Sequence, residues 1–256
     1  MFSKNLTRLF TSIFLLSVSL IVHADTTLVA VAANFTKPMN EIAAAFEKST
    51  GHTAKLSFGS SGKFVAQIEN DAPFEVFLSA DNESPVKLQK DGFAVAKSDF
   101  TYAIGKLVLW SASPNVVDAQ GQVLSKGGFK HIALADPKLA PYGVAAIEVL
   151  KSKKLLEKLT PLFVQGENIA QTFQFVSTGN AELGFVALSQ VIDADKGKIV
   201  TGLSWVIPEN LYAPLKQDAV LLSKGESNPA AVALLKFLKS EPALAIIKKY
   251  GYGLAN

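Results

Sequence analysis

The chain has 256 residues, of which 49% are hydrophobic, and no cysteine, so disulfide bonds and thiolate metal sites are excluded and stability must come from a hydrophobic core. Its formal net charge is +3 at pH 7, and two of these charges, on Lys4 and Arg8, belong to an expected signal peptide. The remainder is nearly neutral and gives no reason to expect a nucleic-acid or membrane partner.

Residues 1–24 have the pattern of a signal peptide. Lys4 and Arg8 make the start of the chain positive, and a mostly apolar run follows over 9–22. This run is shorter than the roughly 20 residues that a membrane-spanning helix needs. Small residues precede Asp25, so we expect cleavage near Ala24 and export of the mature chain.

The mature chain begins with three units of strand and helix. Apolar runs of strand length cover 27–33, 53–58 and 76–80, and each precedes a segment with helical spacing of apolar residues. This alternation predicts a parallel α/β sheet, in which ligands bind at the carboxyl ends of the strands. Polar turns containing Asn34 and Ser61 lie at two of these ends.

The turn 57–64, Ser-Phe-Gly-Ser-Ser-Gly-Lys-Phe, joins the second strand to its helix. The first amides of a helix have no intrahelical acceptor and the helix dipole makes them more positive, so the turn is suited to an oxyanion. It is not a P-loop, because only two residues separate Gly59 from the Gly-Lys pair and Phe64 follows. A plain turn with a serine helix cap explains the same residues and stays open as an alternative.

Ser60 and Lys63 match the Ser-x-x-Lys motif of penicillin-recognising serine enzymes. Those enzymes carry further motifs, and the sequence has no Lys-Thr-Gly or Lys-Ser-Gly triplet. We therefore expect a binding protein rather than an enzyme, with serine acyl transfer as the alternative. The histidines, His23, His52 and His131, are too scattered to predict a metal site.

The second half of the chain repeats the order of strand, polar turn and helix. Its apolar runs of strand length are 106–110, 131–135 and 183–187. Polar turns at 141–143 and 167–169 precede helices, and one more apolar run, 219–222, comes before two helical segments at the C-terminal end. No linker rich in Pro, Gly or Ser separates independent units.

Seven segments are specific in their combined order and spacing: Ala32-Ala33-Asn34, 57–62, 72–81, 106–108, 136–143, 183–186 and Tyr250-Gly251. Together they resemble the molybdate-binding proteins of bacterial molybdate ABC importers, a group of type II periplasmic solute-binding proteins. The resemblance covers essentially the whole mature chain.

This resemblance implies two α/β lobes, each a mainly parallel sheet flanked by helices, joined by two crossing strands, with the anion bound between them. We expect lobe one to comprise 25–104 and 213–256, and lobe two 105–212. It further implies a periplasmic monomer without a cofactor that captures molybdate, and also tungstate, for an ABC permease in the inner membrane. A receptor for sulfate or another small oxyanion is the alternative within the binding class.

The family's ligand positions fall on Asn34, Ser61, Tyr142 and Ile169, the last of them through its backbone amide, so molybdenum would be held only as the oxyanion. Ala187 stands where many members have a tyrosine that contacts the anion, and we expect the Tyr142 hydroxyl to replace it. Each residue also has an ordinary explanation, as a helix cap for Asn34 and Ser61 or as packing for the other two.

None of these four side chains is charged. Hydrogen bonds to a charged group contribute about 1.5–3 kcal/mol each, so several neutral donors can offset the desolvation of a dianion. Phosphate carries a proton near neutral pH that needs an acceptor, and none of these four residues is a carboxylate. The set therefore disfavours phosphate, and cavity size must distinguish sulfate from molybdate and tungstate.

Overall fold

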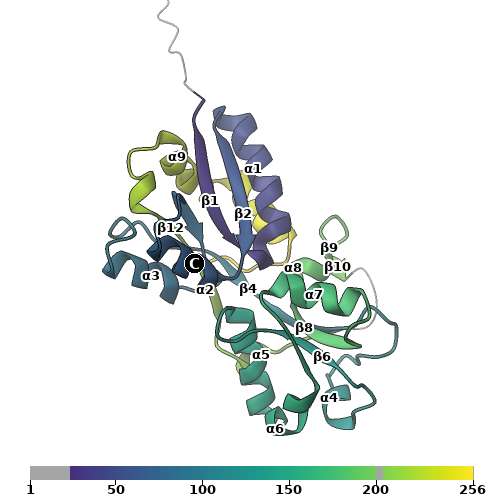
Figure 1. Ribbon diagram of the computed structural model, residues 1–256. Helices are drawn as coiled ribbons and strands as arrows, with labels where there is room; N and C mark the ends of the chain where they lie inside the picture. The colour runs from purple at the N-terminus through teal and green to yellow at the C-terminus, as the bar shows by residue number, and fades with distance from the viewer. Residues whose placement is uncertain (1–23, 200–203, 256) are drawn as a thin grey trace, which may run out of the picture.

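The computed structural model describes residues 24–199 and 204–255 (Figure 1). The predicted signal peptide, apart from Ala24, lies outside the described residues. Within them, no helix is long and apolar enough to cross a membrane.

The first sheet has five strands in the order β2-β1-β3-β12-β4. Their bounds are β1 (Thr26–Ala32), β2 (Thr53–Gly59), β3 (Val76–Leu78), β4 (Phe100–Gly105) and β12 (Leu215–Leu221). β1 pairs in parallel with β2 and β3, as the alternation of strands and helices predicts, whereas β12 is antiparallel to β3 and β4. The sheet is therefore mixed, because the chain returns to it from the other direction.

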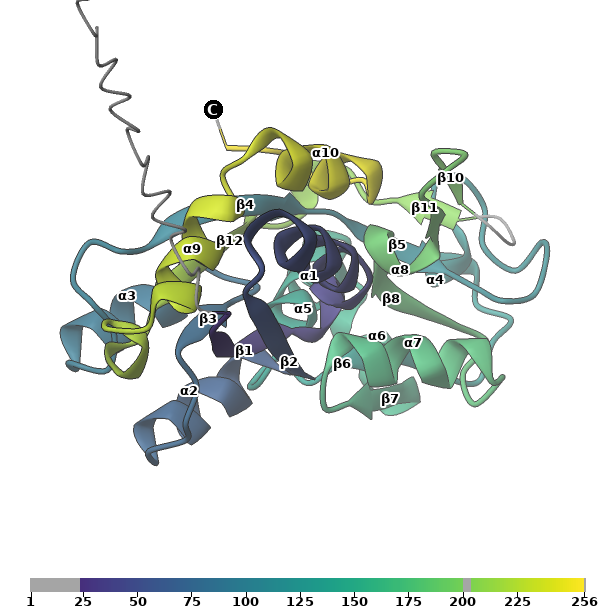
Figure 2. The same cartoon turned by 90° about the horizontal axis from the view of Figure 1, so that it is seen from above.

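Helices cover both faces of this sheet, and we call the sheet with its helices the first lobe. The helices are α1 (Thr36–Thr50), α2 (Ser61–Glu69), α3 (Glu83–Lys90), α9 (Pro229–Phe237) and α10 (Glu241–Lys249). Val29 and Val31 of β1 pack with α1, α9 and α10, while Ala30 between them packs with α2 and α3. Successive side chains of a strand point to opposite faces, so the continuous apolar run of β1 places it between two helical layers (Figure 2).

The second sheet has the order β11-β5-β8-β6-β7. Its strands are β5 (Leu107–Trp110), β6 (Ile132–Ala135), β7 (Phe163–Gly166), β8 (Leu183–Ala187) and β11 (Ser204–Val206). β6 is parallel to β7 and β8, and β5 is antiparallel to β8 and β11. This sheet too is mixed.

The second sheet and its helices form the second lobe. The helices are α4 (Val123–Lys126), α5 (Pro141–Ser152), α6 (Leu156–Leu159), α7 (Ile169–Ser177) and α8 (Leu188–Val191), and a short hairpin of β9 (Ile192–Asp193) and β10 (Lys198–Ile199) follows α8. Short 3-10 turns complete the chain: η1 (Ala33–Phe35), η2 (Thr160–Leu162), η3 (Glu209–Leu211) and η4 (Ser223–Gly225). In Figure 1 the two lobes lie one above the other.

The chain passes between the lobes twice. Lys106 separates β4 from β5, and residues 207–214 lead from β11 to β12. Gly105 ends β4 at the first of these connections, where a Cβ atom would lie 2.3 Å from the hydroxyl oxygen of Tyr142. Only glycine leaves room for this close approach.

Candidate oxyanion-binding site

Four helical N-termini meet between the two lobes. η1 follows β1, α2 follows β2, α5 follows β6 and α7 follows β7. Parallel strands end at the same edge of a sheet, so the helices that follow them begin together at that edge. Asn34 lies in η1, Ser61 is the first residue of α2, Tyr142 the second of α5, and Ile169 the first of α7.

A small cavity of about 10 Å³ lies where these N-termini meet. Its lining comes from both lobes and comprises 32–34, 59–61, 80, 140–142 and 168–169. All four residues predicted from the sequence are in this lining, and each is at most 3% exposed. The lining contains no charged side chain, so the structure brings the four predicted residues together around an uncharged space between the lobes.

The amide groups at the cavity are suited to an anion. The first amides of α2, α5 and α7 have no acceptor within their own helices, and the helix dipoles add partial positive charge there. Asn168 caps α7, because its Oδ1 accepts hydrogen bonds from the amides of Ala170 and Gln171, both at 3.0 Å. This cap fixes the start of α7 and leaves the Ile169 amide outside the capping bonds.

The Ser61 side chain is held in place by a backbone amide. Its Oγ accepts a hydrogen bond of 2.9 Å from the amide of Ala80, which follows β3. An accepting hydroxyl retains its own proton for donation. Ser61 can therefore direct both its amide and its hydroxyl proton to an oxyanion.

The Asn34 side chain is engaged on the side of the first lobe. Its Nδ2 donates to Gln217 Oε1 at 2.8 Å and to the hydroxyl of Tyr252 at 2.9 Å. The backbone carbonyl oxygen of Asn34 accepts from Ser189 Oγ of α8 and from the Tyr252 hydroxyl, both at 2.8 Å. Both amide hydrogens are thus used, and the donor that Asn34 retains for the cavity is its backbone amide at the start of η1.

The Tyr142 hydroxyl lies beside β4 and β12, next to the connections between the lobes. It accepts a hydrogen bond of 3.2 Å from Gln217 Nε2, and burial raises the pKa of Tyr142 well above its usual value, so the phenol stays neutral. The next residue, Gly143, lets α5 start close to β6, because a Cβ atom there would lie 2.2 Å from the carbonyl oxygen of Ala135. The backbone of Tyr142 is thereby held at the cavity, and the expectation that its hydroxyl contacts the anion stays a prediction.

Ala187 is buried and lies outside the lining of the cavity. Its amide donates to Gln190 Oε1 at 2.9 Å, and Gln190 Nε2 donates to the carbonyl oxygen of Ile169 at 2.9 Å. Gln190 therefore connects the position of the family's tyrosine to the start of α7.

Sequence reasoning missed the buried polar residues that support the site. Gln217 of β12 is fully buried, and its Oε1 accepts from the hydroxyl of Tyr102 at 3.1 Å as well as from Asn34. Gln217 lies between Lys216 and Asp218 in the sequence, so no local pattern marked it as buried. The hydrogen bonds of Tyr252 could not be predicted from the sequence either, because its partners come from distant parts of the chain.

Two contacts close the cleft beside the cavity. The amide of Gly62 donates to the carbonyl oxygen of Leu139 at 3.0 Å. Lys63 Nζ and Glu167 Oε2 form a salt bridge of 2.6 Å, with both side chains more than 40% exposed. α2 of the first lobe is thus joined directly to the second lobe, so the structure is a closed form.

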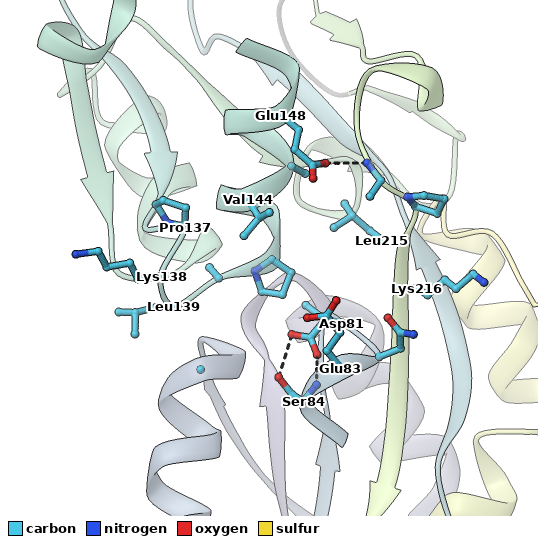
Figure 3. A pocket seen from close by; sticks show the side chains of 18 residues that line it. Asp81, Glu83, Ser84, Pro137, Lys138, Leu139, Val144, Glu148, Leu215 and Lys216 are labelled. Carbon is cyan, nitrogen blue, oxygen red and sulfur yellow. Dashed lines mark hydrogen bonds between the residues drawn. The ribbon is translucent and has the colours of Figure 1, made fainter. Parts of the chain in front are cut away.

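A larger groove of about 330 Å³ adjoins the cavity and shares Ala80, Ala140 and Pro141 with it. Figure 3 shows Asp81, Glu83 and Glu148 around this groove. The carboxylate of Asp81 accepts from the amide of Ser84 at 2.7 Å, and that of Glu148 from the amide of Ala213 at 2.8 Å. Lys138 and Lys216 also line the groove, but three carboxylates outnumber them and repel an anion. The small cavity, with its uncharged lining, is the better candidate for an oxyanion.

Comparisons with known proteins agree with this architecture. Residues 27–253 match the family model described as bacterial extracellular solute-binding protein. The chain is 58% identical over 226 residues to the molybdate-binding protein ModA of Azotobacter vinelandii, covering 88% of this chain and 89% of that protein. It is 55% identical over 229 residues to ModA of Rhodobacter capsulatus, covering 90% and 88%.

Among solved structures, the periplasmic molybdate-binding protein of Azotobacter vinelandii superposes with a TM-score of 0.87 at 45% identity. This superposition covers 90% of the present chain and all of that structure. Its two-lobed fold of mixed sheets flanked by helices is that of type II periplasmic binding proteins. The chain therefore belongs to the bacterial extracellular solute-binding proteins, in the family of the molybdate-binding protein ModA.

Proposed function

We propose that the chain is a periplasmic receptor that captures molybdate, and also tungstate, and delivers it to the permease of an ABC importer. The observation that carries this proposal is the meeting of four helical N-termini from both lobes on one small, uncharged cavity. The similarity to molybdate-binding proteins along nearly the whole chain supports the choice of anion.

In the proposed complex the oxyanion accepts hydrogen bonds from the amides of Asn34, Ser61, Tyr142 and Ile169 and from the Ser61 hydroxyl. Each such bond to an ion contributes about 1.5–3 kcal/mol. Asn34 and Ser61 belong to the first lobe, and Tyr142 and Ile169 to the second. Because the anion bonds to both lobes, it stabilises the closed form, which is the differential affinity that a hinge motion requires.

The proposal assigns 25–104 and 213–256 to one lobe and 105–212 to the other, with the crossings as the hinge. It also includes cleavage of the signal peptide near Ala24, since an exported receptor needs one. The receptor acts as a monomer and has no role in binding nucleic acid.

Catalysis by Ser60 and Lys63 has no support in their contacts. Lys63 Nζ is paired with Glu167 at the surface, whereas Ser60 is 3% exposed. A serine nucleophile needs a base within hydrogen-bond distance, and the described contacts of Ser60 include none. We infer that the protein binds its ligand without turnover.

Calorimetric titration of residues 25–256 with molybdate, tungstate, sulfate and phosphate tests the proposal. We expect tight one-to-one binding of molybdate and tungstate and little heat from phosphate, since the lining of the cavity has no carboxylate to accept its proton. Ser61→Ala should weaken binding, whereas Ser49→Ala, on the exposed face of α1, should not. Tight binding of sulfate instead would assign the protein to another oxyanion importer, and no binding by any anion would refute an oxyanion receptor.

The Tyr142 hydroxyl is tested separately. Tyr142→Phe keeps the backbone amide at the cavity and removes only the hydroxyl that we expect to replace the family's tyrosine. Molybdate affinity equal to that of the unmodified protein would contradict this role.

A further inference from the structure

Ser60 carries a buried hydroxyl group without a hydrogen-bond partner. Among the described residues, three buried side chains have this property, namely Thr27, Ser60 and Ser240. Ser60 is 3% exposed and lies in the lining of the cavity. A buried polar group that loses water without gaining another partner is destabilising, so native structures rarely retain one without a reason.

Helix capping does not provide that reason. Ser60 is the N-cap residue of α2 with φ −79° and ψ 147°, yet its side chain makes no capping hydrogen bond. By contrast, the N-cap residues of α7 and α9, Asn168 and Asn228, both accept hydrogen bonds from amides of their helices. Ser60 contributes to α2 through its carbonyl oxygen, which accepts from the amide of Phe64 at 3.1 Å.

The neighbouring serine differs in the same respect. Ser61 Oγ accepts from the amide of Ala80 at 2.9 Å, whereas Ser60 Oγ has neither a donor nor an acceptor among the described residues. The Ser60 proton therefore needs an acceptor from outside the chain, and the cavity is where one can bind. An ionised oxygen is a strong acceptor and is already favoured there by the helix N-termini.

We propose that the Ser60 hydroxyl donates a hydrogen bond to the bound oxyanion, as a contact residue beyond Asn34, Ser61, Tyr142 and Ile169. This inference rests on the proposed function, because it uses the same cavity and ligand.

The proposal predicts opposite effects of one substitution on the empty and the loaded protein. Ser60→Ala removes an unsatisfied group from the empty protein, so its stability should stay equal or rise. The same change removes a bond to the bound anion, so affinity should fall. A residue that only supported the fold would not separate these two measurements in this way.

Thr27→Val is the matched control. Thr27 is fully buried in β1, also has an unpartnered hydroxyl, and lies outside the lining of the cavity. Valine has nearly the same shape, so this variant removes an orphan hydroxyl without touching the site. It should leave affinity unchanged while stability stays equal or rises.

The experiment measures molybdate affinity by calorimetry and urea unfolding of the ligand-free protein, for residues 25–256 and for the variants Ser60→Ala, Ser60→Gly and Thr27→Val. Glycine is an acceptable N-cap residue, so Ser60→Gly controls for the helix start. We expect molybdate affinity to fall about 10-fold or more in both Ser60 variants, with the unfolding midpoint of Ser60→Ala not lowered.

Unchanged affinity in the Ser60 variants, in a protein that binds molybdate, would overturn the inference and leave the proposed function intact. A fall in affinity accompanied by a lower unfolding midpoint of ligand-free Ser60→Ala would also overturn it, in favour of a structural role. If the unmodified protein binds no molybdate, the proposed function fails, and the inference fails with it.

Discussion

Substitution of Gly105 tests whether the packing at the connection between the lobes affects ligand binding. A Cβ atom at this position would lie 2.3 Å from the Tyr142 hydroxyl oxygen and 2.5 Å from Gln217 Nε2. These two atoms share a hydrogen bond of 3.2 Å and belong to side chains that are at most 2% exposed. Gly105→Ala therefore requires one or both of these buried side chains to shift, which lengthens or breaks their hydrogen bond.

The destabilisation caused by Gly105→Ala has two contributions. Overpacking of a buried contact costs about 1–3 kcal/mol, and leaving the buried Gln217 amide without an acceptor costs about 1–3 kcal/mol. The same shift of the Tyr142 side chain relieves the overpacking and breaks the hydrogen bond, so the two energies do not simply add. We expect a total destabilisation of roughly 2–4 kcal/mol. Tyr142 lies on α5 of the second lobe and Gln217 on β12 of the first, so their bond joins the two lobes in this closed form.

Gly105→Ala should therefore destabilise mainly the closed form of the protein. Molybdate affinity of Gly105→Ala should drop by roughly 30- to 1000-fold, whereas urea unfolding of the ligand-free protein should change less. In the double variant Gly105→Ala/Tyr142→Phe, the atom nearest to the new methyl group is absent, so the loss should be smaller than the sum of the single losses. Unchanged affinity in Gly105→Ala, or strict additivity in the double variant, would refute the reasoning.

Three further predictions concern the closing contact, the helix start and pH. Lys63→Gln removes the exposed salt bridge to Glu167 and should weaken molybdate binding only a few-fold, with less dependence on salt in calorimetry, because exposed pairs contribute about 0–1 kcal/mol. Asn168→Ala removes the cap of α7 and should lower the free energy of urea unfolding by about 1 kcal/mol and weaken binding. Burial raises the pKa of Tyr142 and Tyr252, so unfolding free energy should be fully retained below about pH 10, where unfolded tyrosine ionises, and fall above it.

Each of these predictions has a contrasting control. Lys87→Gln removes ion pairs to Glu69 and Asp91 within the first lobe and should not change binding, so an equal loss in both lysine variants would contradict a closing role for Lys63. Unaltered binding and stability in Asn168→Ala would contradict the capping argument. The pH argument would be wrong if replacing Tyr252 by Phe left the fall above pH 10 unchanged, since above this pH the unfolded chain binds fewer protons than the native one.

The sequence was most informative where a feature depends on neighbouring residues. Apolar runs predicted the positions of β1, β2, β3, β5, β6 and β8. The polar turns at their ends predicted helix starts, and the resemblance to a known family selected one residue in each of four turns. The structure places all four of these residues in one cavity.

Strands without a long apolar run were harder to recognise. β7 and β11 are short and partly exposed, so their sequences carry little hydrophobic pattern. Propensity and pattern are weak where a strand is set by its partners rather than by its own composition. The antiparallel position of β12 in the first sheet depends on the return of the chain, which no local pattern expresses.

By itself, the sequence determined the order of strands, turns and helices and the uncharged nature of the four predicted site residues, since these are properties of adjacent residues. Only the tertiary structure decided that Gln217 and Tyr252 bind Asn34, across 183 and 218 positions of the chain. It alone placed the Tyr142 hydroxyl against Gly105 and left that of Ser60 unpartnered. Such contacts arise when distant segments pack and lose water together, so their geometry depends on the whole fold.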